Sequence, residues 1–146
     1  IRSFTHRRMD EPEKHVSRLA ALQAYEMAGL GPEDMDVVEV HDASAMGEII
    51  QAENLGLVPL GGGGPAAERG EFTLGGRTPI NPSGGLESKG HPLGATGIGQ
   101  LYELVTQLRG EAGARQVEGA RHAIQENGGG LQGIEEAAVA VHILSR

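Results

Sequence analysis

The chain has 146 residues, with 24 glycines, no cysteine and a formal charge of −8. An acidic chain without a basic cluster argues against nucleic-acid binding, because Lys and Arg supply most of the affinity for phosphate backbones. Without cysteine, the chain contains no disulfide, no thiolate metal ligand and no thiol nucleophile. Its apolar content of 38% and charged content of 22%, with no long apolar run and no signal pattern, predict one soluble cytoplasmic domain that does not associate with membranes.

The first nine residues contain three arginines without periodicity. They predict an irregular start, followed by a domain over 10–146. A helix is expected over 10–28, with Asp10 as its N-cap and Gly29 as its stop. The apolar stripe expected on this helix is Val16, Leu19, Ala20, Ala24 and Met27.

A short segment over 36–40 has apolar residues on both faces, which is typical of a buried parallel strand. A helix is expected to follow over 44–55. Gly61–Gly64 predicts a flexible loop, and the chain as far as Thr78 is expected to be an excursion on the surface.

Glycine and proline interrupt 79–99 so often that no regular element is expected before Gly94. An apolar stripe then predicts a helix that ends at Gly110, with the stripe made by Ile98, Leu101, Val105 and Leu108. Two strands over 120–125 and 137–144 complete the chain, and the second should be central because both its faces are apolar. Helices that alternate with short strands predict an α/β domain with a mixed sheet.

Polar residues follow expected strand ends, where α/β proteins place their sites. His41 and Asp42 come after the first strand, although Asp42 could simply cap the next helix. Glu126 opens the glycine run 126–130, which could offer backbone N–H groups to an oxyanion or could form a turn.

His91 lies in the glycine-rich segment 90–97, just before an expected helix. A helix N-terminus disfavours the imidazolium form, so a neutral His91 could accept a proton or polarise a carbonyl. A purely structural histidine in a glycine-rich turn is the alternative. The spacing G-x-x-G-x-G over 94–99 is the reverse of the dinucleotide fingerprint, so nucleotide binding is not predicted. No histidine pair has metal-ligand spacing, so no metal is predicted.

These motifs together resemble the C-terminal half of the thiolase superfamily, in its sterol-carrier-protein and lipid-transfer-protein-like branch. Residues 90–97 read GHPLGATG and are similar to the family motif G-H-P-x-G-x-[ST]-G, with NPSGG before it at 81–85. His41 and Asp42 stand where thiolases have Asn-Glu-Ala-Phe. The run 126–130 takes the place of Cys-x-Gly-Gly-Gly.

The resemblance implies one of the two similar halves of an α-β-α-β-α fold, with a mixed sheet packed between helices. It implies that His91 activates a cysteine of the other half and helps to bind the thioester oxygen. His41 would replace the asparagine that orients a water in the first oxyanion hole. The glycines implied near the second oxyanion hole are Gly128, Gly129 and Gly130, and the residues implied at the acyl-CoA tunnel are Ser83, Gly84 and Gly85. A coenzyme A thioester would be the substrate, with no permanently bound cofactor.

Two family positions that hold cysteine are Ala43 and Glu126 in this chain. Both thiol bases are therefore missing, and Glu126 could act as a carboxylate base if burial raises its pKa. The resemblance implies an acyltransferase that makes or breaks a carbon–carbon bond. The alternatives are an aldolase that cleaves a β-hydroxyacyl-CoA such as a steroid side chain without a covalent intermediate, and a non-catalytic acyl-CoA-binding subunit.

A half-domain without the nucleophile is expected to need partners. The resemblance implies an N-terminal thiolase half, in the same polypeptide or in a second chain. It also implies a homo-oligomer, and some relatives use a small OB-fold partner.

Overall fold

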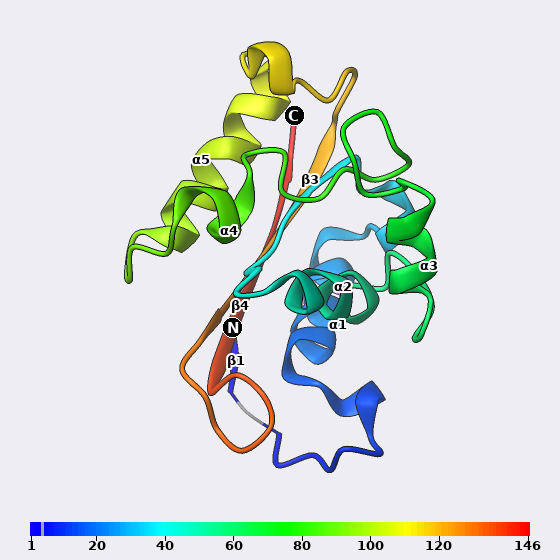
Figure 1. Cartoon of the computed structure of the whole chain (residues 1–146), viewed down its shortest axis with the longest axis vertical. Helices are drawn as coiled ribbons and strands as arrows, with labels where there is room; N and C mark the ends of the chain where they lie inside the picture. The colour runs from blue at the N-terminus through cyan, green and yellow to red at the C-terminus, as the bar shows by residue number, and fades with distance from the viewer. Residues whose placement is uncertain (4) are drawn as a thin grey trace.

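A four-stranded mixed sheet runs through the computed structural model, which describes residues 1–3 and 5–146 (Figure 1). The strands lie in the order β1-β4-β3-β2. Their bounds are Arg2–Ser3 for β1, Val37–Glu39 for β2, His122–Gly129 for β3 and Ala138–Ser145 for β4. β2 is parallel to β3, whereas β4 is antiparallel to both β1 and β3. The predicted mixed sheet is confirmed, and β4 has a strand on each side, as expected.

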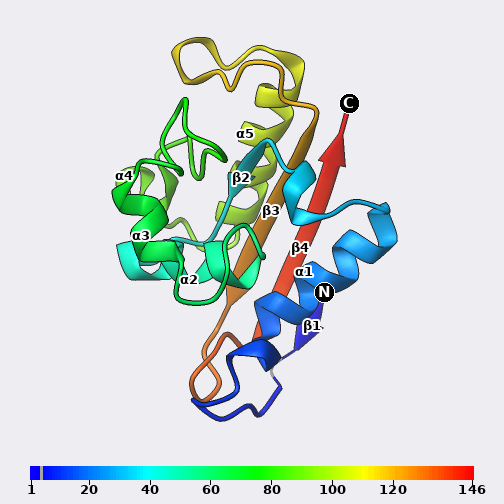
Figure 2. The ribbon, with the colours of Figure 1, turned by 90° about the vertical axis from the view of Figure 1, so that its right-hand side faces the viewer.

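Helices cover both faces of this sheet (Figures 1 and 2). α1 and α2, with α3, lie on one face, and α5 lies on the other with α4 beside it. The bounds of the helices are Val16–Ala28 for α1, Ala45–Asn54 for α2, Gly63–Glu68 for α3, Gly85–Lys89 for α4 and Thr96–Arg109 for α5. Short 3-10 turns are formed by Pro12–Lys14, Pro32–Asp34 and Gly113–Arg115. The predicted α/β class, with a sheet between helices, is confirmed.

β2 is buried on both faces, as its apolar sequence predicted. Val38 and Val40 belong to the larger core cluster, with Leu55 and Ile124, on the side of α1 and α2. Val37 belongs to the smaller cluster beneath α5, with Leu104. A strand with apolar contacts on both sides is held firmly in place, so the residues that follow it are well positioned.

Among the described residues, no helix combines the length and apolar character that crossing a bilayer requires.

α1 starts later than the sequence predicted, at Val16 rather than near Asp10. A 3-10 turn over Pro12–Lys14 precedes it, and the extended backbone of His15 separates the two elements. His15 is the N-cap, because its Nδ1 accepts a hydrogen bond from the amide of Ser17 at 3.2 Å. Asp10 instead pairs with Arg8 on the surface. The predicted stop at Gly29 is confirmed, with a left-handed φ of 67°.

The buried face of α1 is rotated from the predicted stripe. Val16 and Ala20 are buried as expected, whereas Met27 is 81% exposed. The other buried residues of the helix are Ser17, Ala21 and Tyr25. Ser17 can be buried because its hydroxyl donates to the Glu126 carboxylate, a contact that hydrophobic periodicity does not anticipate.

The first residues and the segment after α2 are more regular than predicted. Arg2–Ser3 form β1, which pairs with Ala138 and Val139 at the sheet edge, within the expected irregular start. Two residues are too few to show a periodicity in sequence, and the division of the chain at residue 10 stays a prediction. α3 occupies part of the expected flexible loop. A side chain at Gly63 would come within 2.7 Å of Ile49, so glycine is what lets α3 pack against α2.

α5 has the predicted C-terminal end at Gly110, but its buried face differs from the predicted stripe. Ile98 is 67% exposed. Leu104 and Leu108 are buried together with polar residues, which are Gln100, Glu103 and Gln107. Each glutamine is satisfied by hydrogen bonds, for example from Gln100 to the backbone carbonyl of Glu126 at 3.0 Å. Buried amides with partners carry little penalty, so the apolar pattern alone misjudged which face is covered.

Leu104→Ala should lower the free energy of unfolding by about 2–5 kcal/mol, because Leu104 is fully buried on the inner face of α5 and its truncation leaves a cavity. Leu22→Ala is the matched control. Leu22 is 55% exposed on α1, so this variant should change stability by about 0.5 kcal/mol or less. Urea denaturation of both variants measures the difference, and equal losses would contradict the described core.

Candidate active site

The carboxyl ends of β2 and β3 lie side by side, because the strands are parallel neighbours with Glu39 opposite Gln125. His41 follows β2, and Asn127–Gly129 form the end of β3, so this register brings them to one edge of the sheet. The loop that carries His91 reaches the same edge ahead of α5. A cavity of about 830 Å³ results, and its lining includes His41, His91, Asn127, Gly128 and Glu136.

The two predicted histidines face each other in this cavity. Their ring centroids are 4.8 Å apart, with an interplanar angle of 66°. His41 comes from the end of β2 and His91 from a loop some fifty residues further along the chain. The structure therefore brings together two groups that sequence alone could only place at separate strand and loop ends.

Thr96 determines which nitrogen of the neutral His91 ring carries the proton. Nδ1 of His91 lies 2.7 Å from Oγ1 of Thr96, and that hydroxyl also donates to the carbonyl of Pro92 at 3.3 Å. A hydroxyl has one proton, so both contacts are satisfied only if Nδ1 of His91 carries a proton and donates it. Nε2 then has a free lone pair. His91 can accept a proton at Nε2, which is the capacity that a general base needs.

His41 is neutral in this setting. Burial lowers the pKa of His41, and the neighbouring His91 ring lowers it further. Interactions of the ring with the backbone of Gly128 and the side chain of Asn127 oppose this lowering of the pKa. A neutral imidazole still carries one N–H, which can donate a hydrogen bond. His41 is thus arranged as a neutral hydrogen-bond donor.

Glu126 lies behind His41 and outside the cavity lining. Its side chain is fully buried, and its carboxylate accepts hydrogen bonds from the backbone N–H of His41 at 3.1 Å and from Ser17 at 3.3 Å. Burial raises the pKa of Glu126 to about 8, and the nearby Glu136 charge adds to the rise. Burial therefore raises the pKa of Glu126, as a carboxylate base at this position requires. The structure does not bring the carboxylate into the cavity, however, and the base role stays a prediction.

The predicted glycines at the end of β3 line the cavity. Gly128 and Gly129 pair with Val139 and Ala138 of β4, so the run continues a strand rather than forming the alternative turn. Gly130 follows with a left-handed φ of 66°, where glycine avoids strain. The oxyanion role of these backbone groups stays a prediction.

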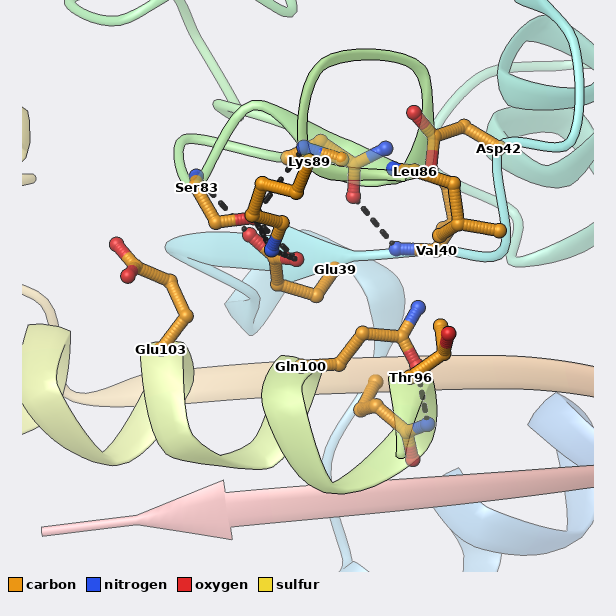
Figure 3. A network of polar contacts seen from close by, with 12 residues as sticks. Glu39, Val40, Asp42, Ser83, Leu86, Lys89, Thr96, Gln100 and Glu103 are labelled. Carbon is orange, nitrogen blue, oxygen red and sulfur yellow. Dashed lines mark hydrogen bonds and ion pairs between the residues drawn. The ribbon is translucent and has the colours of Figure 1, made fainter. Parts of the chain in front are cut away.

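The predicted substrate residues Ser83, Gly84 and Gly85 are not part of this cavity lining. Figure 3 shows that Ser83 is instead held by β2: its hydroxyl and backbone N–H bind the Glu39 carboxylate at 2.8 and 3.2 Å. Lys89 donates to the same hydroxyl. Burial raises the pKa of Glu39 to about 7, against the hydrogen bonds from Ser83 and the nearby Lys89 charge. The loop that precedes His91 is therefore hydrogen-bonded to β2, the strand that precedes His41.

Asp42 fastens this loop at a second point. Its carboxylate accepts hydrogen bonds from the backbone amides of Leu86 at 2.7 Å and Glu87 at 3.4 Å, so it caps α4 (Figure 3). The interpretation that Asp42 caps the following helix α2 is wrong, because Ser44 accepts the amide of Gly47 there. Gly85 makes the approach possible: it has a φ of 60°, and any Cβ would overlap the Asp42 carboxylate.

Thr96, Asn127 and Glu136 also line the cavity, although no role was predicted for any of them from the sequence. Thr96 matches the Ser or Thr of the family motif, which was the available signal. Glu136 lies in the connection between β3 and β4 and has no motif around it. The described residues contain no group of three metal-ligating side chains suited to hold an ion.

Comparisons with known proteins agree with this architecture. A family model described as thiolase C-terminal domain-like matches residues 2–146. Sterol carrier protein 2 of Rattus norvegicus is 57% identical over 112 residues, which are 77% of this chain and 20% of that protein. The acetyl-CoA acetyltransferase of Methanothermobacter thermautotrophicus is 50% identical over 141 residues, which are 97% of this chain and 36% of that protein.

A solved structure shows the same fold. One chain of the "Ltp2-ChsH2(DUF35) aldolase" has a TM-score of 0.75 at 23% identity, over 88% of this chain and 31% of that chain. The family model over residues 2–146 identifies a thiolase-type C-terminal domain. The chain belongs to the thiolase superfamily and corresponds to its C-terminal half, as its motifs predicted. It spans between 20% and 36% of the length of the two relatives.

Glu126→Gln should change how stability depends on pH. The Glu126 pKa is raised from 4.5 to about 8, so the folded state binds this proton more tightly than the unfolded chain does. The contribution is fully present below about pH 4.5 and is lost as the pH rises towards 8. Glutamine cannot ionise, so the variant does not lose this stability. The urea midpoint of the variant, relative to that of the wild type, should therefore rise from pH 5 to pH 8. A constant difference would contradict the raised pKa.

Asp42→Ala should free the first turn of α4, because the amides of Leu86 and Glu87 lose their acceptor. Loss of a cap costs about 1 kcal/mol, and hydrogen exchange at these two amides should become faster. Ser44→Ala is the matched control, since Ser44 caps α2 from the same loop. It should accelerate exchange at Gly47 and leave Leu86 unchanged. Mass-spectrometric exchange that shows the same pattern in both variants would contradict the assignment of the two caps.

Proposed function

We propose that this chain is the C-terminal half of an acyltransferase that acts on acyl-CoA thioesters and makes or breaks a carbon–carbon bond. The observation that carries the proposal is the pair formed by His41 and His91, 4.8 Å apart in one cavity, with complementary roles. Nε2 of His91 is free to accept a proton, and His41 is a neutral donor. Thiolysis and Claisen condensation need both: a base for a thiol and a donor for a thioester oxygen that becomes negative.

The nucleophile comes from outside this chain, because the chain has no cysteine. We assign that group to a cysteine of the N-terminal thiolase half. Its thiol proton goes to Nε2 of His91, and the thiolate attacks the acyl carbonyl carbon. The bond from that carbon to the coenzyme A sulfur then breaks, and His91 returns the proton to the leaving thiolate. We assign His41 to the first oxyanion site and the backbone of Gly128–Gly130 to the second. The acetyl-CoA acetyltransferase relative supports this assignment by the reaction in its name.

Exposed apolar residues beside the cavity support a covering partner. Leu93, Ile98 and Leu131 line the cavity and have exposed fractions of 85%, 67% and 86%. Exposed apolar side chains gathered at one cavity are typical of an interaction face, and the N-terminal half is the partner that the family supplies. A homo-oligomer and an OB-fold partner stay predictions.

A thiolase-like aldolase is the second candidate. Neither Ala43 nor Glu126 provides the thiol that Claisen chemistry uses as its second base. An aldolase that cleaves a β-hydroxyacyl-CoA needs no covalent thioester. It needs a base for the hydroxyl proton and donors for the thioester enolate, and His91 and His41 could fill these roles.

His91→Ala should lower the turnover of the whole enzyme on acyl-CoA by on the order of 100-fold or more, because the base at Nε2 is lost. His122→Ala is the matched control, since His122 lies at the far end of β3 and binds Ser145. Steady-state kinetics measure both variants. Normal turnover of His91→Ala would remove His91 from the mechanism.

Mass spectrometry of the whole enzyme after incubation with acetyl-CoA distinguishes the two reactions. The acyltransferase predicts an acylated cysteine in the N-terminal half. An unlabelled enzyme that releases an aldehyde or ketone from a β-hydroxyacyl-CoA, and does so after the cysteine is replaced, supports the aldolase. An enzyme that binds acyl-CoA but shows neither reaction would contradict the acyltransferase and the aldolase. That result would support a non-catalytic acyl-CoA-binding subunit.

A further inference from the structure

Glu136 is the one carboxylate among the described residues that line the cavity. It lies in the connection between β3 and β4, far in sequence from both histidines, and its side chain is 23% exposed. Neither the family motifs nor the proposed roles of His41 and His91 use it. A thiolase-like site that lacks both usual thiol bases still needs a base. The position of Glu136 in the cavity lining suits that role.

Two contacts hold Glu136 in position. Nε2 of Gln51, from α2, donates to Oε1 of Glu136 at 2.9 Å. The side chain packs across Gly128, where a Cβ would come within 2.5 Å of Cγ of Glu136, so only glycine leaves room for it. A carboxylate held by a neighbouring helix and by a strand backbone has little freedom to turn away from the cavity.

One oxygen of the Glu136 carboxylate has no hydrogen-bond partner among the described residues. Oε2 of Glu136 is buried without a hydrogen-bond partner, and Nε2 of His15 lies 3.7 Å away, too far for a hydrogen bond. Burial lowers the pKa of His15, so that ring is neutral and does not offset the carboxylate charge. An unpaired buried carboxylate oxygen is costly and uncommon.

Glu126 is less suited to this role. Both oxygens of its carboxylate already accept hydrogen bonds, from His41 and from Ser17, and the side chain is fully buried behind the cavity. A base has to reach the proton that it removes. Glu136 lines the cavity, whereas Glu126 lies behind it and accepts a hydrogen bond from the backbone N–H of His41.

We propose that Glu136 is the carboxylate base that exchanges a proton with the α-carbon of the bound acyl-CoA. The inference rests on the proposed function. In the condensing direction the Cα–H bond breaks, its electron pair stays on the thioester as an enolate, and the proton passes to the Glu136 carboxylate. In the cleaving direction Glu136 returns the proton to the same carbon. Both the acyltransferase and the aldolase pass through this enolate, so the role is common to them.

The whole enzyme containing this chain and its N-terminal half, incubated with propionyl-CoA in deuterated water, provides the test. Deuterium at the α-carbon is followed by mass spectrometry, with acylation of the cysteine and carbon–carbon bond turnover measured in parallel. Glu136→Gln keeps the oxygen that Gln51 binds and removes the base. It should slow α-exchange and turnover by on the order of 100-fold and leave acyl-CoA binding unchanged. Glu118→Gln, an exposed site away from the cavity, controls for the lost charge.

The outcomes separate the two proposals. A wild-type enzyme that turns over, with α-exchange equally fast in Glu136→Gln, overturns the role of Glu136 and leaves the proposed function standing. Slow exchange in Glu136→Gln, with binding intact and Glu118→Gln normal, supports it. A wild-type enzyme without exchange or turnover contradicts the proposed function and the role of Glu136 together. Partial recovery in Glu136→Asp would show that a carboxylate, rather than the shape of the side chain, is required.

Discussion

The parallel pairing of β2 with β3 fixes where every group of the site can lie, because it brings two strand ends to one edge of the sheet. Glu39 stands opposite Gln125, so His41 follows one strand beside the glycine end of the other. β2 is only three residues long, yet apolar contacts on both faces hold it. A shift of one residue in this register would exchange the faces of β2 and move His41 away from the cavity.

Buried carboxylates then connect this edge to the loop of His91. Glu39 binds Ser83, and Asp42 caps α4, so the chain before His91 is fastened on both sides of His41. Ionised groups are costly to bury unless they are hydrogen-bonded. Here they accept hydrogen bonds from backbone amides and from the Ser83 hydroxyl. These contacts help to set where the loop of His91 lies relative to His41.

Helix ends marked by glycine could be predicted, and buried helix faces could not. Gly29 and Gly110 stop α1 and α5 because a left-handed residue is a local requirement. The predicted stripes misplaced Met27 and Ile98, which are exposed, because the covered faces include serine and glutamine side chains that find partners across the sheet. Hydrophobic periodicity contains no information about those distant partners.

The sequence by itself determined the family, the histidines at 41 and 91 and the glycines around them, because these depend on local motifs with fixed spacing. Only the tertiary structure decided which carboxylate belongs to the cavity. Glu126 follows a recognisable motif and yet is turned to the α1 side of β3, where it binds Ser17. Glu136 has no motif and reaches the cavity through the β3–β4 connection. Side chains alternate between the faces of a strand, so the pairing of β3 and its covering helices determine which residue meets the substrate.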